Sequence, residues 1–301
     1  MDLVEQQLLI SAGHKLQFTQ DDIAINGHSV EYRVYAEDPS RKFLPSIGFL
    51  RKYKEPNTEV ANERVRIDTG VEEGSEISMF YDPMISKLIT WGKDRDDAMR
   101  ILDRTFDEYV IQGVTHNIGF GKSILANEGF AKGDYSTAFI PTYYPDGFSG
   151  DKLTSQDNRL LALTSYLNHN SEETRIVRLP DGDYKISHEN GKYTITDLAN
   201  GDSHEATVDS YSFTNNSLIR LSIDGQENLV HFHRRENDGM TSTYGLKGNL
   251  IKATIFDERQ HELSTHMPEP VVIDSAKVVM SPMPGAIVDI FVQPGDKVVD
   301  G

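Results

Sequence analysis

The chain has 301 residues and a mixed composition, enough for about two or three globular domains. Its 47 acidic and 30 basic residues give a formal net charge of -17, which disfavours nucleic-acid phosphates and anionic lipids as partners. The sequence contains no cysteine, which excludes disulfides, thiolate zinc sites and cysteine nucleophiles. Since no apolar run approaches the roughly 20 residues of a membrane helix, we expect neither nucleic acid nor a membrane as partner.

Residues 1–20 predict a short helical tail in which Gly13 is available as a stop. A helix this short cannot bury its apolar side by itself, so we expect the chain to begin inside a larger fold. The same segment has neither a signal-peptide core nor an arginine-rich transit pattern.

Mixed strands and helices are expected from Gly27 to about Leu125. Alternation at Val30, Tyr32 and Val34 predicts a strand with two different faces. The clearest helix follows Gly92, where apolar residues recur at helical spacing.

Three aspartates crowd the start of that helix: Asp94, Asp96 and Asp97. They lack the glycine and the distal glutamate of a calcium loop, so we interpret them as helix capping. A domain boundary is expected within 143–150, where Pro145-Asp146-Gly147 has strong turn chemistry.

A second module begins with an apolar-rich helix over 153–167 and continues, from Arg175 to Phe256, as short alternating runs. Asn190-Gly191 and Asp224-Gly225 are typical two-residue hairpin loops. One helix among roughly seven or eight strands predicts a helix wrapped by an antiparallel sheet or barrel. Two roles stay open for the helix, which could dock a partner or form the internal core of the module.

The end of the chain predicts a linker over 263–276 and a hairpin over 277–301. Turn chemistry at Ser281-Pro282-Met283-Pro284-Gly285 and at Pro294-Gly295-Asp296 encloses an alternating run. Two strands alone are marginally stable in water, so this hairpin is expected to be half of a larger unit.

Three long motifs occur in the order found in biotin carboxylases. They are Gly27–Pro39 with Phe43–Gly48 following, then Tyr81–Leu88, then Gly113–Asn117. Together they resemble the C-terminal subdomain of that family. With Tyr144–Phe148, the helix-plus-strands module and Ser281–Gly285, the chain resembles α subunits of biotin-dependent acyl-CoA carboxylases, most of all the propionyl-CoA carboxylase group.

This resemblance implies an α+β, multidomain chain. Residues 1–148 would be the biotin carboxylase C-terminal subdomain, a mixed sheet plus helices, and 149–262 a subunit-docking module in which a β-barrel-like sheet surrounds a helix. After the 263–276 linker, residues 277–301 would be the N-terminal half of a biotin carboxyl carrier domain, the first hairpin of a biotinyl/lipoyl-type β-sandwich.

The resemblance also implies a reaction for the parent enzyme, a ligase of the mitochondrial matrix. ATP, Mg and bicarbonate serve to carboxylate biotin, and a β subunit passes the carboxyl group to propionyl-CoA. This sequence has neither a glycine-rich phosphate loop nor an Ala-Met-Lys-Met biotin-attachment tetrapeptide. We therefore expect a C-terminal fragment that is inactive alone and that, in the parent, belongs to a homo-oligomeric α assembly bound to the β subunit.

Two other functions stay open. One is the α subunit of 3-methylcrotonyl-CoA carboxylase, which shares the motifs of the first domain. The other is a non-enzymatic interaction module built on residues 151–256. Binding to a carboxylase β subunit would separate the interaction module from the carboxylase fragment.

The resemblance implies that Arg33 faces the ureido group of biotin as a catalytic residue. A guanidinium suits this role because it stabilises an oxyanion without changing protonation. The structural alternative is an ion pair of Arg33 with Glu31, Glu37 or Asp38. Asp82 is a weaker candidate for biotin binding.

Two further groups of residues have ordinary structural interpretations. Asp82 and Glu37 are more simply explained as turn-capping residues, because Asp38 and Asp82 each precede a proline. His231 and His233 share a strand face, but no nearby residue completes a metal-binding pattern, so we expect core-edge or solvated histidines and no metal.

Overall fold

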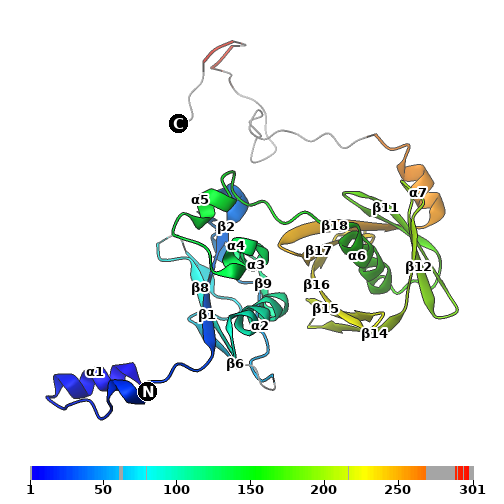
Figure 1. Cartoon of the computed structure of the whole chain (residues 1–301). Helices are drawn as coiled ribbons and strands as arrows, with labels where there is room; N and C mark the ends of the chain where they lie inside the picture. Colours follow the sequence, from blue (N-terminus) through cyan, green and yellow to red (C-terminus); the bar gives the residue numbers. More distant parts are fainter. Residues whose placement is uncertain are drawn as a thin grey trace. The chain divides into compact units, whose positions relative to one another are not determined.

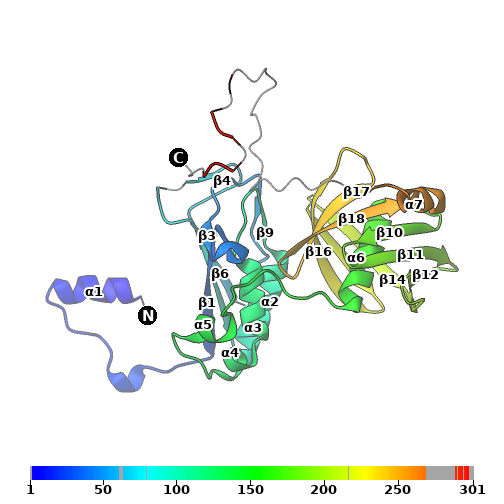
Figure 2. The ribbon, with the colours of Figure 1, turned by 90° about the horizontal axis from the view of Figure 1, so that it is seen from above.

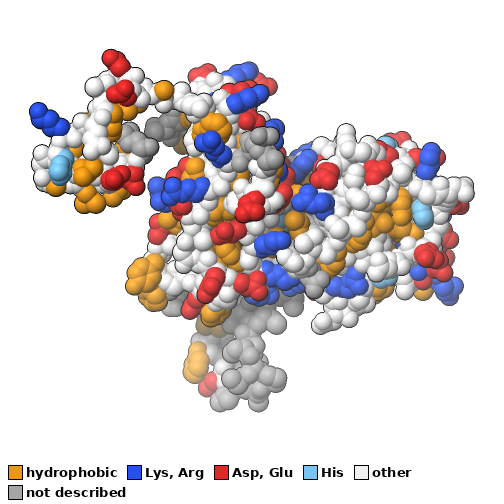
Figure 3. All heavy atoms as spheres, turned by 90° about the horizontal axis from the view of Figure 1, so that it is seen from below, with side chains coloured by type: hydrophobic (Ala, Val, Ile, Leu, Met, Phe, Trp, Pro, Cys, Tyr) orange, Lys and Arg blue, Asp and Glu red, His pale blue; other side chains and the backbone are white. Residues whose placement is uncertain are grey.

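A computed structural model describes residues 2–60, 64–78, 80–215 and 217–268, together with 289, 291–293 and 295–297. The chain divides into a compact unit of residues 1–261 and a second unit of residues 262–301. Within the part described, no helix is long and apolar enough to cross a membrane. In the space-filling view, acidic and basic side chains are interspersed on the face shown (Figure 3).

The predicted N-terminal tail is a short helix, α1 (Leu3–Ser11). Asp2 caps it by accepting hydrogen bonds from the main-chain N–H groups of Val4 and Glu5 at 2.9 and 3.0 Å. Gly13 follows with a φ of 89°, a conformation that favours glycine. The predicted helix and its stop are confirmed, and none of the α1 side chains is buried.

Residues 28–148, which we call the N-terminal region, are built around an antiparallel sheet of three strands in the order β1-β8-β6. The strands are β1 (His28–Tyr35), β6 (Arg64–Thr69) and β8 (Met84–Gly92). Helix α2 (Arg95–Glu108) packs on β8 and β1 (Figure 1). The predicted two-faced strand is confirmed, because Val30, Tyr32 and Val34 belong to one apolar core that also contains Leu88 and Phe106.

The predicted start of α2 is also confirmed. The side chain of Asp94 accepts a hydrogen bond from the main-chain N–H of Asp97 at 2.9 Å, and Asp96 and Asp97 lie in the first turn. Shorter elements complete the region: β2 (Glu37–Asp38), β3 (Leu44–Pro45), β4 (Gly48–Phe49), β5 (Lys52–Lys54), β7 (Glu76–Ile77), β9 (Val110–Gln112), α3 (Ile118–Ala126), α4 (Glu128–Lys132), α5 (Phe139–Tyr143) and short 3-10 helices at Gln20–Asp22 and Pro39–Arg41.

Residues 153–256, which we call the barrel region, form one antiparallel nine-stranded sheet in the order β13-β12-β11-β10-β18-β17-β16-β15-β14. The sheet curls around helix α6 (Ser155–Asn168) (Figures 1 and 2). Its strands are β10 (Arg175–Leu179), β11 (Gly182–Glu189), β12 (Lys192–Asp197), β13 (Ser203–Ala206), β14 (Val208–Thr214), β15 (Leu218–Ile223), β16 (Gln226–Arg235), β17 (Thr241–Leu246) and β18 (Asn249–Phe256). The predicted α+β class, with a helix wrapped by an antiparallel sheet, is confirmed.

Helix α6 is the core of this region. Leu161, Ala162, Leu163 and Tyr166 are buried against the inner faces of the strands, which favours the core role over partner docking for this face of the helix. The predicted helix start is corrected, because Leu153 lies outside α6. Thr154 is the N-cap, forming a capping box with Asp157.

Both predicted hairpins are confirmed. Asn190 and Gly191 have φ values of 52° and 78° between β11 and β12, and Asp224 and Gly225 have 49° and 77° between β15 and β16. The sequence did not point to a third such loop, at Lys247-Gly248 between β17 and β18.

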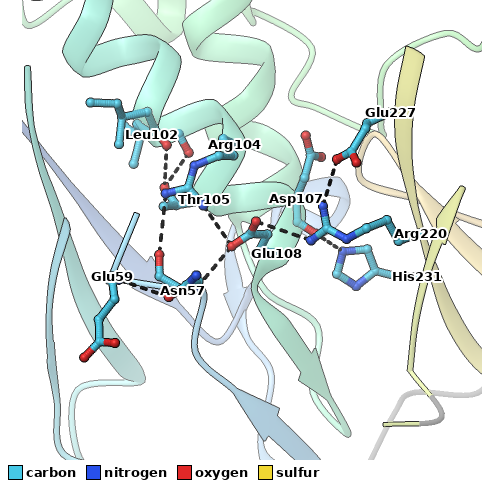
Figure 4. Close-up of polar contacts among 11 residues, drawn as sticks. Asn57, Glu59, Leu102, Arg104, Thr105, Asp107, Glu108, Arg220, Glu227 and His231 are labelled. Atoms are coloured by element: carbon cyan, nitrogen blue, oxygen red, sulfur yellow. Dashed lines mark hydrogen bonds and ion pairs between the residues drawn. The ribbon is translucent and has the colours of Figure 1, made fainter. Parts of the chain in front are cut away.

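The N-terminal region and the barrel region are joined by direct polar contacts. The ring Nε2 of His231 on β16 lies 2.8 Å from the main-chain oxygen of Asp107 on α2. The Gln112 amide donates to the main-chain oxygen of Phe232 at 2.8 Å. Figure 4 shows Arg220 of β15 between Glu108 of α2 and Glu227 of β16, at 3.5 and 3.0 Å.

The last elements of the chain were predicted as a linker and a carrier hairpin. Helix α7 (Glu258–Ser264) lies mostly within the predicted 149–262 module and overlaps the linker predicted over 263–276 at residues 263 and 264. His261 in this helix contacts Asp183. Apart from the few described positions after 268, the rest of the linker and the 277–301 hairpin lie outside the described residues.

Candidate functional site

The candidate site is the outer face of the three-stranded sheet. Because successive residues of a strand point to opposite faces, Arg33 points away from the core that holds Tyr32 and Val34. In the register of the sheet, Arg33 lies opposite Lys87 of β8, and Lys87 lies opposite Asp68 of β6. Two residues away along β1, on the same face, Glu31 lies opposite Ile89 of β8, and Ile89 lies opposite Arg66 of β6. The face therefore carries charges of both signs around Arg33.

The Arg33 guanidinium is accessible. Its side chain is 56% exposed, and its Nε lies 3.2 Å from Glu31 Oε1. Hydrogen bonding to Tyr35, then to Glu31, raises the pKa of Arg33, so the side chain stays cationic. The ion pair with Glu31 that was considered as the structural alternative is present, but in an exposed pair it still leaves the guanidinium open to a ligand. The catalytic role of Arg33 stays a prediction.

Asn117, from the third motif, holds the strand that carries Arg33. Its side chain is buried, and its amide nitrogen donates to the main-chain oxygen of Arg33 at 3.1 Å. Its amide oxygen accepts from the main-chain N–H of Tyr35 at 3.0 Å. The Tyr32 hydroxyl donates to the main-chain oxygen of Asn117 at 2.7 Å. These hydrogen bonds hold the first and third motifs together, although the two motifs are far apart in sequence.

The second motif lies at the same edge of the sheet. The main-chain N–H of Ala36 donates to the oxygen of Pro83 at 2.8 Å, which joins the first motif to the second. A carboxyl oxygen of Asp82 accepts from the Met84 N–H at 3.2 Å, as expected for a turn-capping residue. Burial, then the charge of Asp82, raises the pKa of Glu37. A role of Asp82 toward biotin stays a prediction.

The two predicted histidines lie elsewhere, at the junction of the N-terminal and barrel regions. His231 and His233 line a cavity together with His116 from the third motif. Among the described residues, no group of three or more His, Cys, Asp or Glu side chains is arranged to hold a metal ion. No sequence pattern pointed to His116 or Arg51 in this cavity, because neither residue is close in sequence to the strand that carries His231.

Comparison with known families matches two parts of the chain. Residues 31–142 match the biotin carboxylase C-terminal domain, and residues 156–269 match the propionyl-coenzyme A carboxylase BT domain. The whole chain is 40% identical to the mitochondrial propionyl-CoA carboxylase alpha chain of Homo sapiens and 38% identical to that of Mus musculus. It spans 44% of the length of each of these relatives.

One solved structure is similar to part of this chain. It is the biotin carboxylase domain dimer of the Hydrogenobacter thermophilus 2-oxoglutarate carboxylase, in complex with MgADP and bicarbonate. The likeness covers 48% of this chain and 31% of that chain, at 33% identity and a TM-score of 0.44.

Proposed function

We infer that this chain belongs to the family of propionyl-CoA carboxylase alpha chains, because it carries the biotin carboxylase C-terminal and propionyl-CoA carboxylase BT domains. We propose that it supplies one wall of a biotin carboxylation site and a docking module for a β subunit. Similarity to these alpha chains along the whole chain carries this proposal. The parent reaction would carboxylate biotin with ATP and bicarbonate and pass the carboxyl group to propionyl-CoA.

Arg33 is the residue we propose for the biotin wall, with Asp82 as a lesser contributor. The support is physical: a permanent cation lies on an exposed sheet face, on a strand fixed by buried Asn117. A guanidinium in this position fits a ureido oxygen, to which it can donate hydrogen bonds while neutralising developing negative charge. Other parts of the parent enzyme would bind ATP, Mg and bicarbonate. We propose no lysine of this chain as the site of biotin attachment.

The barrel region is the part we propose for β-subunit docking. Propionyl-CoA is favoured over 3-methylcrotonyl-CoA as the acceptor. The support is the match of residues 156–269 to the propionyl-coenzyme A carboxylase BT domain. A mitochondrial matrix location and an oligomeric α assembly complete the proposal, with domains at 1–148, 149–262, 263–276 and 277–301.

Binding to purified β subunits tests the proposal. The 301-residue chain, immobilised through a C-terminal tag, is incubated with the β subunit of propionyl-CoA carboxylase or of 3-methylcrotonyl-CoA carboxylase. Retention of the first at least about tenfold above the second supports the proposal. Equal retention of both β subunits, or retention of neither, contradicts the assignment of the barrel region. Preferential retention of the 3-methylcrotonyl-CoA carboxylase β subunit would change the proposed acyl-CoA substrate.

A further inference from the structure

A cavity of about 340 Å³ lies where the N-terminal region meets the barrel region, inside the first compact unit. One part of its wall is apolar and includes Phe106, Val114, Ile118, Leu229 and Leu246. Polar and charged side chains line the rest of it, and they include three imidazoles, Arg51, Lys122 and Lys247. A cavity that combines an apolar wall with converging polar groups suits a small molecule that has both an apolar and a polar part.

Three imidazoles line this cavity. His231 is fixed by its contact with the Asp107 main chain, which Figure 4 shows. His233 has no hydrogen-bond partner among the residues that the structure describes, and the Nδ1 atom of His116 is buried without one. Because a buried polar atom without a partner costs free energy, His116 is open to a ligand that supplies the missing hydrogen bond, and the half-buried His233 can donate to the same ligand.

An arginine completes the set. Arg51 lines the same cavity and acts electrostatically on His233, yet within the described ranges its guanidinium has no hydrogen bond or ion pair. The only carboxylate among the described lining residues, Asp107, lies 2.7 Å from Lys122 Nζ. Lys122 Nζ also lies 2.8 Å from Asp103, so both carboxylates pair with this lysine, whereas the exposed Arg51 has no ion-pair partner among the described residues.

We propose that this cavity binds a small carboxylate with a short apolar body, whose carboxylate is held by Arg51 and His233 and whose hydrocarbon part lies against the apolar part of the wall. Carboxylate is the natural counterpart of an unpaired guanidinium. The apolar part of the wall favours such a ligand over a purely polar anion such as inorganic phosphate. This inference does not rest on the proposed function, since the cavity is formed by other residues than the Arg33 face.

The test uses the 301-residue chain and three probes of similar size: butyrate, n-butanol and n-butylammonium. Binding is followed by the NMR resonances of the histidine rings at constant ionic strength. Butyrate should shift the His116 and His233 resonances with a dissociation constant on the order of millimolar, and n-butylammonium should not shift them. Equal effects of all three probes would overturn the proposal.

The variant Arg51→Gln should weaken butyrate binding about tenfold or more, because a hydrogen-bonded ion pair is lost. Arg259→Gln is the matched control: it removes the same charge from an exposed position on α7 that does not line the cavity, and it should bind like the parent. The proposal fails if Arg51→Gln, shown by circular dichroism to be folded, binds butyrate as tightly as the parent. It also fails if butyrate leaves the histidine resonances of the parent unchanged.

Discussion

Gly119, at the start of α3, packs directly against Gly248 in the loop between β17 and β18. A Cβ atom on either residue would overlap the Cα of the other. Gly248 also has a φ of 76°, which the two-residue loop requires. This pair allows the main chains of the N-terminal and barrel regions to approach closely, beside the polar contacts of α2 with β15 and β16.

Replacing Gly119 with alanine should therefore destabilise the chain. An alanine in a helix is ordinarily favourable relative to glycine by about 0.5–1 kcal/mol. Here we expect the opposite sign, a decrease of about 1–3 kcal/mol in the free energy of unfolding, because the added methyl group overlaps main-chain atoms. Urea denaturation measures it. Gly70→Ala is the control, since a Cβ there meets no atom within 4 Å, and its effect should be small. A stabilised Gly119→Ala variant would contradict the packing.

Removal of the Asn117 side chain should also destabilise the chain. Asn117→Ala loses the bonds to Arg33 and Tyr35, and leaves main-chain groups of β1 without partners. We expect a decrease of about 2–3 kcal/mol in the free energy of unfolding. Asn26→Ala, at an exposed position, serves as the control. If both variants unfold at the same urea concentration, Asn117 does not hold the strand as described.

The histidines of the cavity predict how stability depends on pH. Burial, then the neighbouring His231, lowers the pKa of His116 and of His233 from 6.5 to about 4. Between these values the unfolded chain binds protons that the folded chain does not, so the free energy of unfolding should fall as the pH drops from 6.5 to about 4. Below that range these two groups should contribute no further loss.

Urea denaturation from about pH 7.5 down to about pH 5 measures this dependence. Burial raises the pKa of Asp107, whose protonation acts with the opposite sign, so the histidine effect is taken from the difference between the parent and a variant that keeps Asp107. The variant His233→Gln should show a shallower decrease than the parent. Identical pH profiles for the two proteins would show that His233 is not buried in its neutral form.

Local sequence signals predicted the elements that depend on neighbouring residues. Asp94 marks the start of α2 because its side chain caps a nearby N–H. Asp224-Gly225 marks a hairpin because both residues take positive φ values. Such signals act over a few residues, so they can be seen in the sequence without knowledge of the fold.

Two features of the fold left no recognisable pattern in the sequence: a polar edge strand and contacts between residues far apart in the chain. The edge strand β13 is short and polar, with Ser203, His204 and Glu205 exposed, so no apolar alternation pointed to it, and the sheet has nine strands where seven or eight were expected. The contact of Gln112 with Phe232 joins residues 120 positions apart. Periodicity contains no information on such pairs, and for this reason the cavity with Arg51 and His116 could not be predicted.

The most direct test of the proposed function concerns Arg33. In the human alpha chain, the segment matched by this chain is replaced with the 301 residues, and bicarbonate-dependent ATP hydrolysis with free biotin is measured. Arg33→Ala should lower the rate about a hundredfold or more, since it removes a cation placed for the developing charge. Arg66→Ala is the matched control, because Arg66 lies on the same sheet and pairs with Asp68 as Arg33 pairs with Glu31. An active chimera that loses activity only with Arg33→Ala is the predicted result; equal activity of both variants would contradict the account.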